Sequence, residues 1–205
     1  MLFRSSKEEK VLYITYEKEL AKKAKETFEE MGAENVEALT FKELMTITDF
    51  NGRSKKFKFR FKDHFRSWFL RSRSNVEFLR QANIISPNYY DAFSTSYVFF
   101  RGVIEGSLDN LGKKDERDLI LTKEEFLAKV EGEDGLSKEQ KEAIYYVALA
   151  YERHLQKEGG ITDNKFAQRM IRHGKKEIYD AVVVDEYQDL TELQLFAITQ
   201  VLKGL

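Results

Sequence analysis

The chain has 205 residues, of which 42% are hydrophobic and 13% aromatic, so it holds enough apolar material for one or two cores. Charged residues make up 34% of the chain, but the two signs nearly cancel and the net charge is -1. This balance argues against a wholly basic nucleic-acid coat protein, although it leaves room for a local basic patch. The absence of cysteine excludes a disulfide framework, a thiolate metal site and thiol redox chemistry.

The opening residues, MLFRSSKEEK, contain no apolar segment of the kind found in a secretion signal, and no stretch approaches the length of a membrane span. Together with the absence of cysteine, this predicts a cytoplasmic protein without a membrane partner. The three histidines, His64, His154 and His173, do not have the spacing of metal ligands. We interpret all three as structural or surface residues.

Two β-rich runs flank an amphipathic stretch near the N-terminus. Residues 11–15 (VLYIT) are β-branched and aromatic, which predicts a strand. In residues 16–32 apolar side chains recur at helical spacing, and Gly32 stands where a C-terminal cap is expected. A second strand is predicted over residues 35–41 (NVEALTF). Strand, helix and strand in about 30 residues make a βαβ unit, which implies parallel pairing.

The middle of the chain, residues 46–160, has few β-runs and several helix starts. Residues 122–125 (TKEE) and 137–140 (SKEQ) fit the capping-box pattern, so each predicts the N-terminus of a helix. The second of these helices is expected to end at Gly159, and Asp163 is expected to cap a shorter helix. This part of the chain is therefore predicted to be mostly helical.

The end of the chain returns to strand and helix. Residues 181–184 are apolar without alternation, which predicts a strand buried on both faces, and Thr191 is placed to cap the last helix. We therefore predict one α/β domain with a parallel sheet, built from residues 1–45 and 161–205. Residues 46–160 form a mostly helical subdomain inserted into it.

An acidic pair, Asp185 and Glu186, directly follows the last predicted strand. The carboxyl ends of parallel strands are where open α/β sheets bind ligands. Asp185 suits a ligand of Mg²⁺, and Glu186 suits a base that orients and deprotonates an attacking water. For the bare sequence VVVDE, a polar stop after a core strand is an equally good interpretation.

The longer string VVVDEYQDLTELQL resembles motif II of the UvrD/Rep-type superfamily 1 helicases, in which an apolar run precedes Asp-Glu-aromatic-Gln-Asp and a helix. Asp185, Glu186, Gln188 and Asp189 fall at the matching positions. The resemblance implies a RecA-like sheet of the P-loop NTPase type, with ATP and Mg²⁺ as cofactors. It also implies an ATP-dependent DNA helicase that moves 3′ to 5′ along single-stranded DNA. In such a motor, Gln188 and Asp189 link the nucleotide site to the elements that face DNA.

Two earlier segments resemble motifs Ia and Ib of the same family. In the first (VLYITYEKELAKKA), Thr15 and Tyr16 stand at the end of the predicted strand, and Thr40 and Phe41 end the second (VEALTF). By this resemblance all four residues lie on the floor that carries single-stranded DNA, where hydroxyls and rings suit phosphates and bases. Packing of a βα junction explains Tyr16 and Phe41 equally well. Lys42 stands where the family usually has a histidine, which is a departure from the pattern.

A loop that cradles phosphates is the usual partner of motif II, and the sequence offers only a poor substitute. In GSLDNLGKK, Gly106 and Gly112 are one residue too far apart, and Lys114 stands where a Mg²⁺-binding hydroxyl belongs. In the family, the Walker A loop precedes motif Ia, and a second, arginine-bearing RecA-like domain follows motif II. We therefore expect a helicase fragment whose partners are DNA and the remainder of the motor. Alone, it should bind no nucleotide tightly, lack useful ATPase and associate through an unpaired sheet edge.

Residues 53–73 (RSKKFKFRFKDHFRSWFLRSR) form a basic stretch with interleaved aromatic residues. On a strand, the alternation would place cations on one face and rings on the other. We interpret the cations as phosphate contacts, and Trp68 or Phe69 as candidates for base stacking, although a core face is the favoured explanation for the rings. The alternating cations are Lys56, Lys58, Arg60 and Lys62.

By resemblance, the mostly helical middle segment corresponds in position and length to the family's subdomain 1B.

Two other functions compete with the helicase fragment. A free-standing nucleic-acid-binding or regulatory protein, derived from a helicase, would keep the DNA-facing parts without catalysis. A helical protein-interaction domain would explain the middle of the chain, but it would leave the motifs at both ends to chance.

Overall fold

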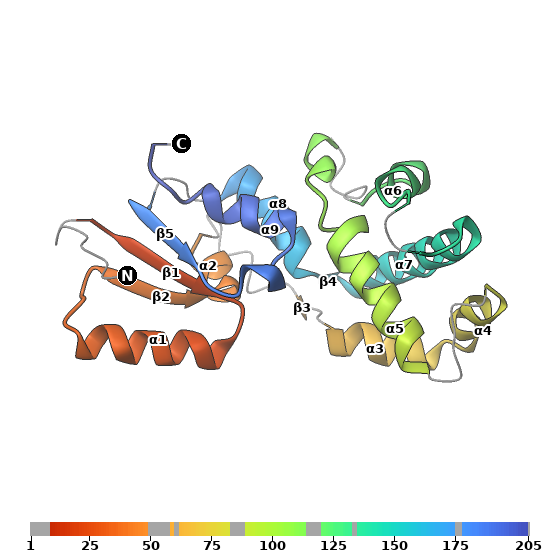
Figure 1. Cartoon of the computed structure of the whole chain (residues 1–205), viewed down its shortest axis with the longest axis horizontal. Coiled ribbons are helices and arrows are strands. Elements are labelled where there is room, and N and C mark those ends of the chain that lie inside the picture. The colour runs from red at the N-terminus through yellow and green to blue at the C-terminus, as the bar shows by residue number, and fades with distance from the viewer. Residues whose placement is uncertain are drawn as a thin grey trace. The chain divides into compact units, whose positions relative to one another are not determined.

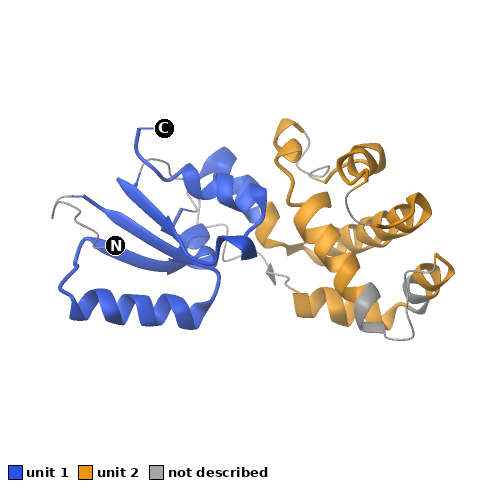
Figure 2. Ribbon diagram, in the orientation of Figure 1, with its two compact units in different colours: residues 1–56, 166–205 blue, residues 57–165 orange. Residues whose placement is uncertain are grey.

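The structure, a computed structural model of the chain, describes residues 9–48, 58–59, 62–82, 89–113, 120–132, 135–174 and 178–204. The chain forms two compact units, one of residues 1–56 with 166–205 and one of residues 57–165 (Figure 2). The first unit extends beyond the expected boundary at residue 45 because the helix over Phe41–Thr48 packs against a strand of the same unit.

Unit 1 is built around a three-stranded parallel sheet (Figure 1). The strands are β1 (Val11–Thr15), β2 (Val36–Thr40) and β5 (Ala181–Val184), and their order is β2-β1-β5. Helix α1 (Lys18–Glu30) connects β1 to β2 and packs on both strands. The predicted parallel βαβ unit is confirmed, and with it the α/β class of the fold.

The central strand β1 is the buried one, because a strand lies on either side of it and its Val11, Leu12 and Ile14 are almost fully covered. Strand β5 is only partly buried at all four of its residues. The prediction of a strand buried on both faces was therefore wrong. Within the part of the chain that the structure describes, β5 pairs with β1 alone, so it is an edge strand and one of its edges is open.

Three further helices complete unit 1: α2 (Phe41–Thr48), α9 (Glu192–Thr199) and most of α8 (Asp163–His173). Figure 1 shows α1 on one side of the sheet and α9 on the other. The predicted cap of α9 is confirmed, because the hydroxyl of Thr191 accepts a hydrogen bond from the Gln194 amide. Helix α8 begins one residue earlier than expected. Its cap is Thr162, whose hydroxyl accepts from the Lys165 amide at 3.2 Å.

Unit 2 is mostly helical, as the sequence predicts. Its longest helix, α7, is closed by Gly159 in the left-handed conformation, and both predicted capping boxes are present. No described helix of the chain is both long enough and apolar enough to cross a membrane. The helices are α3 (Lys62–Arg71), α4 (Arg73–Gln81), α5 (Tyr89–Val98), the π-helix η2 (Phe99–Ile104), the 3₁₀ helix η3 (Leu108–Gly112), α6 (Lys123–Lys129) and α7 (Lys138–Glu158).

The core of unit 2 is rich in aromatic side chains. Phe65 lies at its centre, with the rings of Phe69, Phe93, Phe100 and Tyr151 around it at centroid distances of 4.7–6.1 Å. All five side chains are buried. A short parallel pair, β3 (Lys58–Phe59) with β4 (Gly160–Ile161), joins the two ends of the unit.

A buried polar cluster lies where η2 ends and α8 begins. The carboxyl group of Glu105 is fully buried and accepts hydrogen bonds from the Thr162 hydroxyl at 2.7 Å and the Asn164 side-chain amide at 3.4 Å. The side-chain amide of Asn164 also donates to the carbonyl oxygen of Arg101 at 2.7 Å. Burial raises the pKa of Glu105 to about 8, so this carboxyl group is protonated at neutral pH.

Candidate functional site

The three strands of unit 1 deliver residues from distant parts of the sequence to one edge of the sheet. In the parallel register, Thr15 lies beside Thr40, and Ile14 lies beside Val184. Asp185 continues that register, because its amide donates to the carbonyl oxygen of Ile14 at 2.8 Å. The carboxyl ends of the three strands therefore meet, which is where parallel α/β sheets bind ligands.

Asp185 is held in place by Tyr13, a residue of β1 that lies inside the motif Ia segment but was not predicted as a site residue. The hydroxyl of Tyr13 donates a hydrogen bond to the carboxylate of Asp185. Burial, and then the neighbouring Asp185, raise the pKa of Tyr13 to about 12, so the phenol remains a donor at all ordinary pH values. The ring of Tyr13 packs edge-on against Phe28 of α1 at 5.6 Å. This contact fixes the ring that orients the acidic group.

Glu186 occupies a strained, exposed turn. Its φ angle is 51°, and it is the one non-glycine residue with positive φ among the described residues. Left-handed backbone costs a residue with a Cβ about 1 kcal/mol, and such strain gathers at functional sites. The Gln188 side-chain amide donates to the Glu186 carboxylate, and the Asp189 amide donates to the Glu186 carbonyl oxygen at 3.0 Å. The turn thus keeps the second carboxylate at the surface, next to Asp185.

The two threonines expected on the DNA floor both have structural roles. Thr15 is fully buried, and its hydroxyl lies 3.4 Å from the Glu17 amide, from which it accepts. Thr40 and Glu43 form a reciprocal cap at the start of α2. The Thr40 amide donates to the Glu43 carboxylate at 2.8 Å, and the Thr40 hydroxyl accepts from the Glu43 amide at 3.1 Å.

The two aromatic residues of that floor differ from each other. Phe41 is the first residue of α2 and is only 1% exposed, so its ring belongs to the core of unit 1 and is not available to stack on a base. Tyr16 follows β1 and is half-buried, so part of its side chain reaches solvent at the carboxyl edge. Of the two aromatic residues, Tyr16 is therefore the one that is partly accessible to solvent.

Within the basic stretch, Lys58–Phe59 is the short strand β3 and Lys62–Arg71 is the helix α3. Lys62 begins α3 and is exposed, and Arg66 lies one turn later, also exposed. Phe65 and Phe69 are fully buried, which excludes Phe69 as a base-stacking residue. At 3.6 residues per turn these two cations and two rings lie on neighbouring parts of the helix surface, so α3 does not separate them onto two opposite faces as a strand would. Lys56 and Arg60 lie outside the described residues, and Lys58 is described by its backbone alone.

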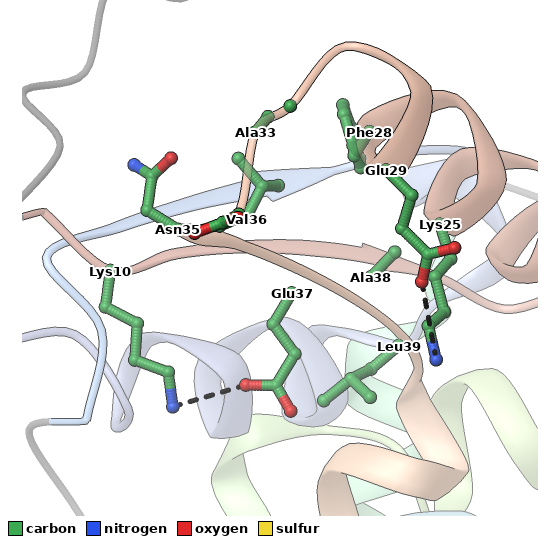
Figure 3. A pocket seen from close by; sticks show the side chains of 12 residues that line it. Lys10, Lys25, Phe28, Glu29, Ala33, Asn35, Val36, Glu37, Ala38 and Leu39 are labelled. Atoms are coloured by element: carbon green, nitrogen blue, oxygen red, sulfur yellow. Dashed lines mark ion pairs between the residues drawn. The ribbon is translucent and has the colours of Figure 1, made fainter.

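The hollow of unit 1, with a volume of about 610 Å³, lies away from the acidic pair. It runs along the outer strand β2 and the turn that follows α1 (Figure 3). Two ion pairs line it, Lys10 with Glu37 at 3.2 Å and Lys25 with Glu29 at 3.9 Å. These charges are already paired, so the hollow offers a ligand less than the carboxyl edge does.

The donors at the carboxyl edge fit the metal half of a nucleotide site. Carboxylate oxygens are ligands that Mg²⁺ prefers, and the half-buried Asp185 and the exposed Glu186 bring two carboxylates to the end of one strand. The segment rejected as a phosphate loop remains a poor candidate in the structure. It follows the π-helix η2 rather than a strand, and Leu108–Gly112 within it forms a 3₁₀ turn.

Two of the histidines, interpreted from the sequence as structural or surface residues, lie together. The side-chain nitrogens of His64 and His154 and a carboxylate oxygen of Glu158 all lie within 4.8 Å of one another. His154 and Glu158 are four residues apart on α7, but His64 comes from α3, so spacing in the sequence does not show the group of three.

Neither a family model, nor a curated protein, nor a solved structure matches the chain. The functional assignment therefore depends on the residues and their geometry.

Proposed function

We propose that the chain is the N-terminal motor part of a UvrD/Rep-like, ATP-dependent DNA helicase. The observation that carries this proposal is the convergence of three motif ends, Thr15, Thr40 and Asp185, at the carboxyl edge of one parallel sheet. If the match to motif II were accidental, there would be no structural reason for its aspartate to lie beside the end of the strand that matches motif Ia. The sheet is then the RecA-like part of the motor, and unit 2 is its inserted subdomain.

In this proposal the two acidic residues have different roles. Asp185 would hold Mg²⁺, while the Tyr13 hydroxyl keeps its carboxylate oriented. Glu186 would position and deprotonate the attacking water, and it lies in an exposed turn. When bound, Mg-ATP would supply the phosphoryl group whose hydrolysis drives translocation.

DNA binding is assigned to two surfaces, each described within its own unit. In unit 1, the half-buried ring of Tyr16 lies at the carboxyl edge and is placed to contact a base. In unit 2, the exposed face of α3 carries Lys62 and Arg66, whose charges suit the phosphates of the backbone. Asp63 is the acidic residue on that part of α3.

The remainder of the motor is the proposed protein partner. The open edge of β5 is apolar in sequence and half-exposed, which is the state of a strand that accepts another beside it. Tyr179, just before β5, already makes a parallel bridge to Leu202, which follows α9. This isolated bridge lies before β5, so among the described residues Ala181–Val184 pair on one side only. The purified chain should self-associate there, and a clean monomer in sizing chromatography at high concentration would count against this assignment.

The decisive test is enzymatic. The reading frame that contains this chain is expressed with all that its gene encodes on either side, and ATP hydrolysis is measured with and without single-stranded DNA. We expect DNA-stimulated hydrolysis that Glu186→Gln abolishes without loss of DNA binding. Stop codons directly on both sides of the chain, combined with salt-dependent DNA binding and no ATPase, would instead favour the free-standing nucleic-acid-binding protein.

A further inference from the structure

Unit 2 contains a cluster of two histidines and a glutamate that the proposed motor does not use. The Nε2 atom of His64 lies 3.2 Å from Oε2 of Glu158, and Nε2 of His154 lies 3.5 Å from Oε1 of the same carboxylate. The two imidazole rings stack at 5.6 Å with an interplanar angle of 14°. One carboxylate therefore faces two imidazole nitrogens at once, and all three side chains are accessible to solvent in part.

A fully buried tyrosine fixes the orientation of His64. The Tyr151 hydroxyl lies 2.9 Å from Nδ1 of His64, and the Tyr151 side chain is 1% exposed in the aromatic core. In the tautomer that carries its proton on Nδ1, the phenol oxygen accepts from Nδ1 and the lone pair of the ring is on Nε2, the atom that faces Glu158. A hydrogen bond from the second ring nitrogen to a fixed acceptor is the usual support of a metal-binding histidine.

We propose that His64, His154 and Glu158 form a binding site for a divalent transition metal, with zinc as the best fit. Two neutral imidazole nitrogens and one carboxylate are a known ligand set for zinc. With metal–ligand bonds of about 2.0–2.1 Å, tetrahedral ligand atoms lie roughly 3.3 Å apart. The two contacts between Glu158 and the histidines, at 3.2 and 3.5 Å, are close to this spacing, and they involve the two different oxygens of the carboxylate. One ligand atom from each of the three residues lies within 4.8 Å of the others, so side-chain rotation has to bring them together around an ion.

Three protein ligands leave one position of a tetrahedral ion open. The cluster lines a hollow of about 410 Å³, together with Ser67, Trp68 and Arg71. A water molecule or a small anion has room to complete the coordination there, and the guanidinium of Arg71 favours an anion. This site goes beyond the proposed helicase function, because it lies in unit 2 and uses none of the nucleotide or DNA residues.

The composition of the chain makes the proposal sharply testable. The chain has no cysteine and three histidines, so His173, a residue outside the cluster, serves as the matched control. Zinc affinity of the untagged full chain is measured by competition with a chromogenic chelator. We expect one zinc ion per chain, and His64→Gln or His154→Gln, each of which removes a ligand, should weaken binding by at least about 100-fold, the upper end of the loss caused by changing an outer-shell partner. His173→Gln should leave the affinity unchanged.

The single tryptophan gives a second readout of metal binding, and the wild-type chain provides it without any substitution. The Trp68 ring stacks on His154 at 6.0 Å, so Co²⁺ bound in the cluster should quench its fluorescence at a stoichiometry of one. Glu158→Gln, at the end of α7, keeps the aromatic core intact and should abolish this quenching. A folded wild-type chain that binds no stoichiometric metal, or an equal loss of affinity in His173→Gln, would overturn the proposal.

Discussion

The hydroxyl of Tyr13 donates a hydrogen bond to the carboxylate of Asp185, although 172 positions separate the two residues in the sequence. The parallel pairing of β1 with β5 brings them together, since Tyr13 lies beside Val183 in the register. The first strand of unit 1 thus supplies the group that orients the acidic residue after the last strand. Loss of this bond would therefore affect both the stability of the sheet and the orientation of Asp185 in the candidate metal site.

Tyr13→Phe should destabilise unit 1 by about 1–2 kcal/mol, because it removes a hydrogen bond to a charged acceptor while keeping the ring. The measurement is hydrogen exchange of the β1 and β5 amides. Asp185→Asn and the double variant complete a double-mutant cycle, and we expect the two effects to be non-additive by at least 0.5 kcal/mol. Strict additivity would mean that the Tyr13 bond contributes nothing to the site.

Glu186→Gly should stabilise unit 1 by about 1 kcal/mol relative to Glu186→Ala, because only glycine adopts the left-handed backbone without strain. Both variants lose the carboxylate and its bond to Gln188, so their difference isolates the backbone conformation. Thermal unfolding followed by circular dichroism compares the two. If the alanine variant is as stable as the glycine variant, the positive φ angle at this position carries no strain.

The buried carboxyl group of Glu105 should make unit 2 less stable as the pH rises. Its pKa is about 8 in the folded chain and 4.5 as the reference for the unfolded chain. The folded chain therefore holds a proton that the unfolded chain releases between these values. The stabilisation is complete below about pH 4.5, declines by up to about 1.4 kcal/mol per pH unit, and is lost near pH 8.

Urea unfolding of unit 2, followed by Trp68 fluorescence at several pH values, measures this dependence. Glu105→Gln is neutral at every pH, so most of the slope between pH 5 and about 8 should disappear in that variant. Glu131→Gln changes an exposed glutamate of the same unit and should leave the slope as it is. An unchanged slope in the Glu105 variant would show that another group releases the proton.

Reversing two charges on α3, with Lys62→Glu and Arg66→Glu together, should weaken binding of single-stranded DNA and flatten its dependence on salt. Each lost phosphate contact lowers the slope of log affinity against log salt by about 0.7. Fluorescence anisotropy of a labelled oligonucleotide at several salt concentrations gives both quantities. The matched control reverses Lys22 and Lys25, two exposed lysines of α1. If both pairs act equally, net charge and not the α3 face determines binding.

Much of the secondary structure was predictable because it depends on local chemistry. The β-branched run 11–15, the capping boxes at 122–125 and 137–140, and Gly159 as a C-terminal cap all occur as expected. The burial of residues 181–184 was predicted wrongly, since an apolar run does not say whether its strand is central or at an edge.

The contacts that build the sites could not be predicted, because they join residues that are distant in the sequence. Nothing near Tyr13 indicates its partner Asp185, and nothing near His64 indicates Glu158. The buried pair of Glu105 with Thr162 is likewise tertiary, and the polar residues involved resemble loop residues in the sequence. The sequence left a half-buried strand and a helix both open for the basic stretch, because its alternation of phenylalanine and cation fits a strand but stops where α3 begins at Lys62.

The π-helix η2 has a consequence for how this protein tolerates insertion and deletion. A π-turn holds one residue more than an α-turn, and here it closes with the Glu105 amide bonded to the Phe100 carbonyl oxygen at 2.9 Å. Deleting a single residue between Phe100 and Glu105 would restore ordinary α-helical winding. It would also rotate Glu105 about 100° around the helix axis, away from Thr162 and Asn164. A length change of one residue in this turn would therefore break the buried hydrogen bonds of Glu105, whereas the same change in a surface loop would have little effect on stability.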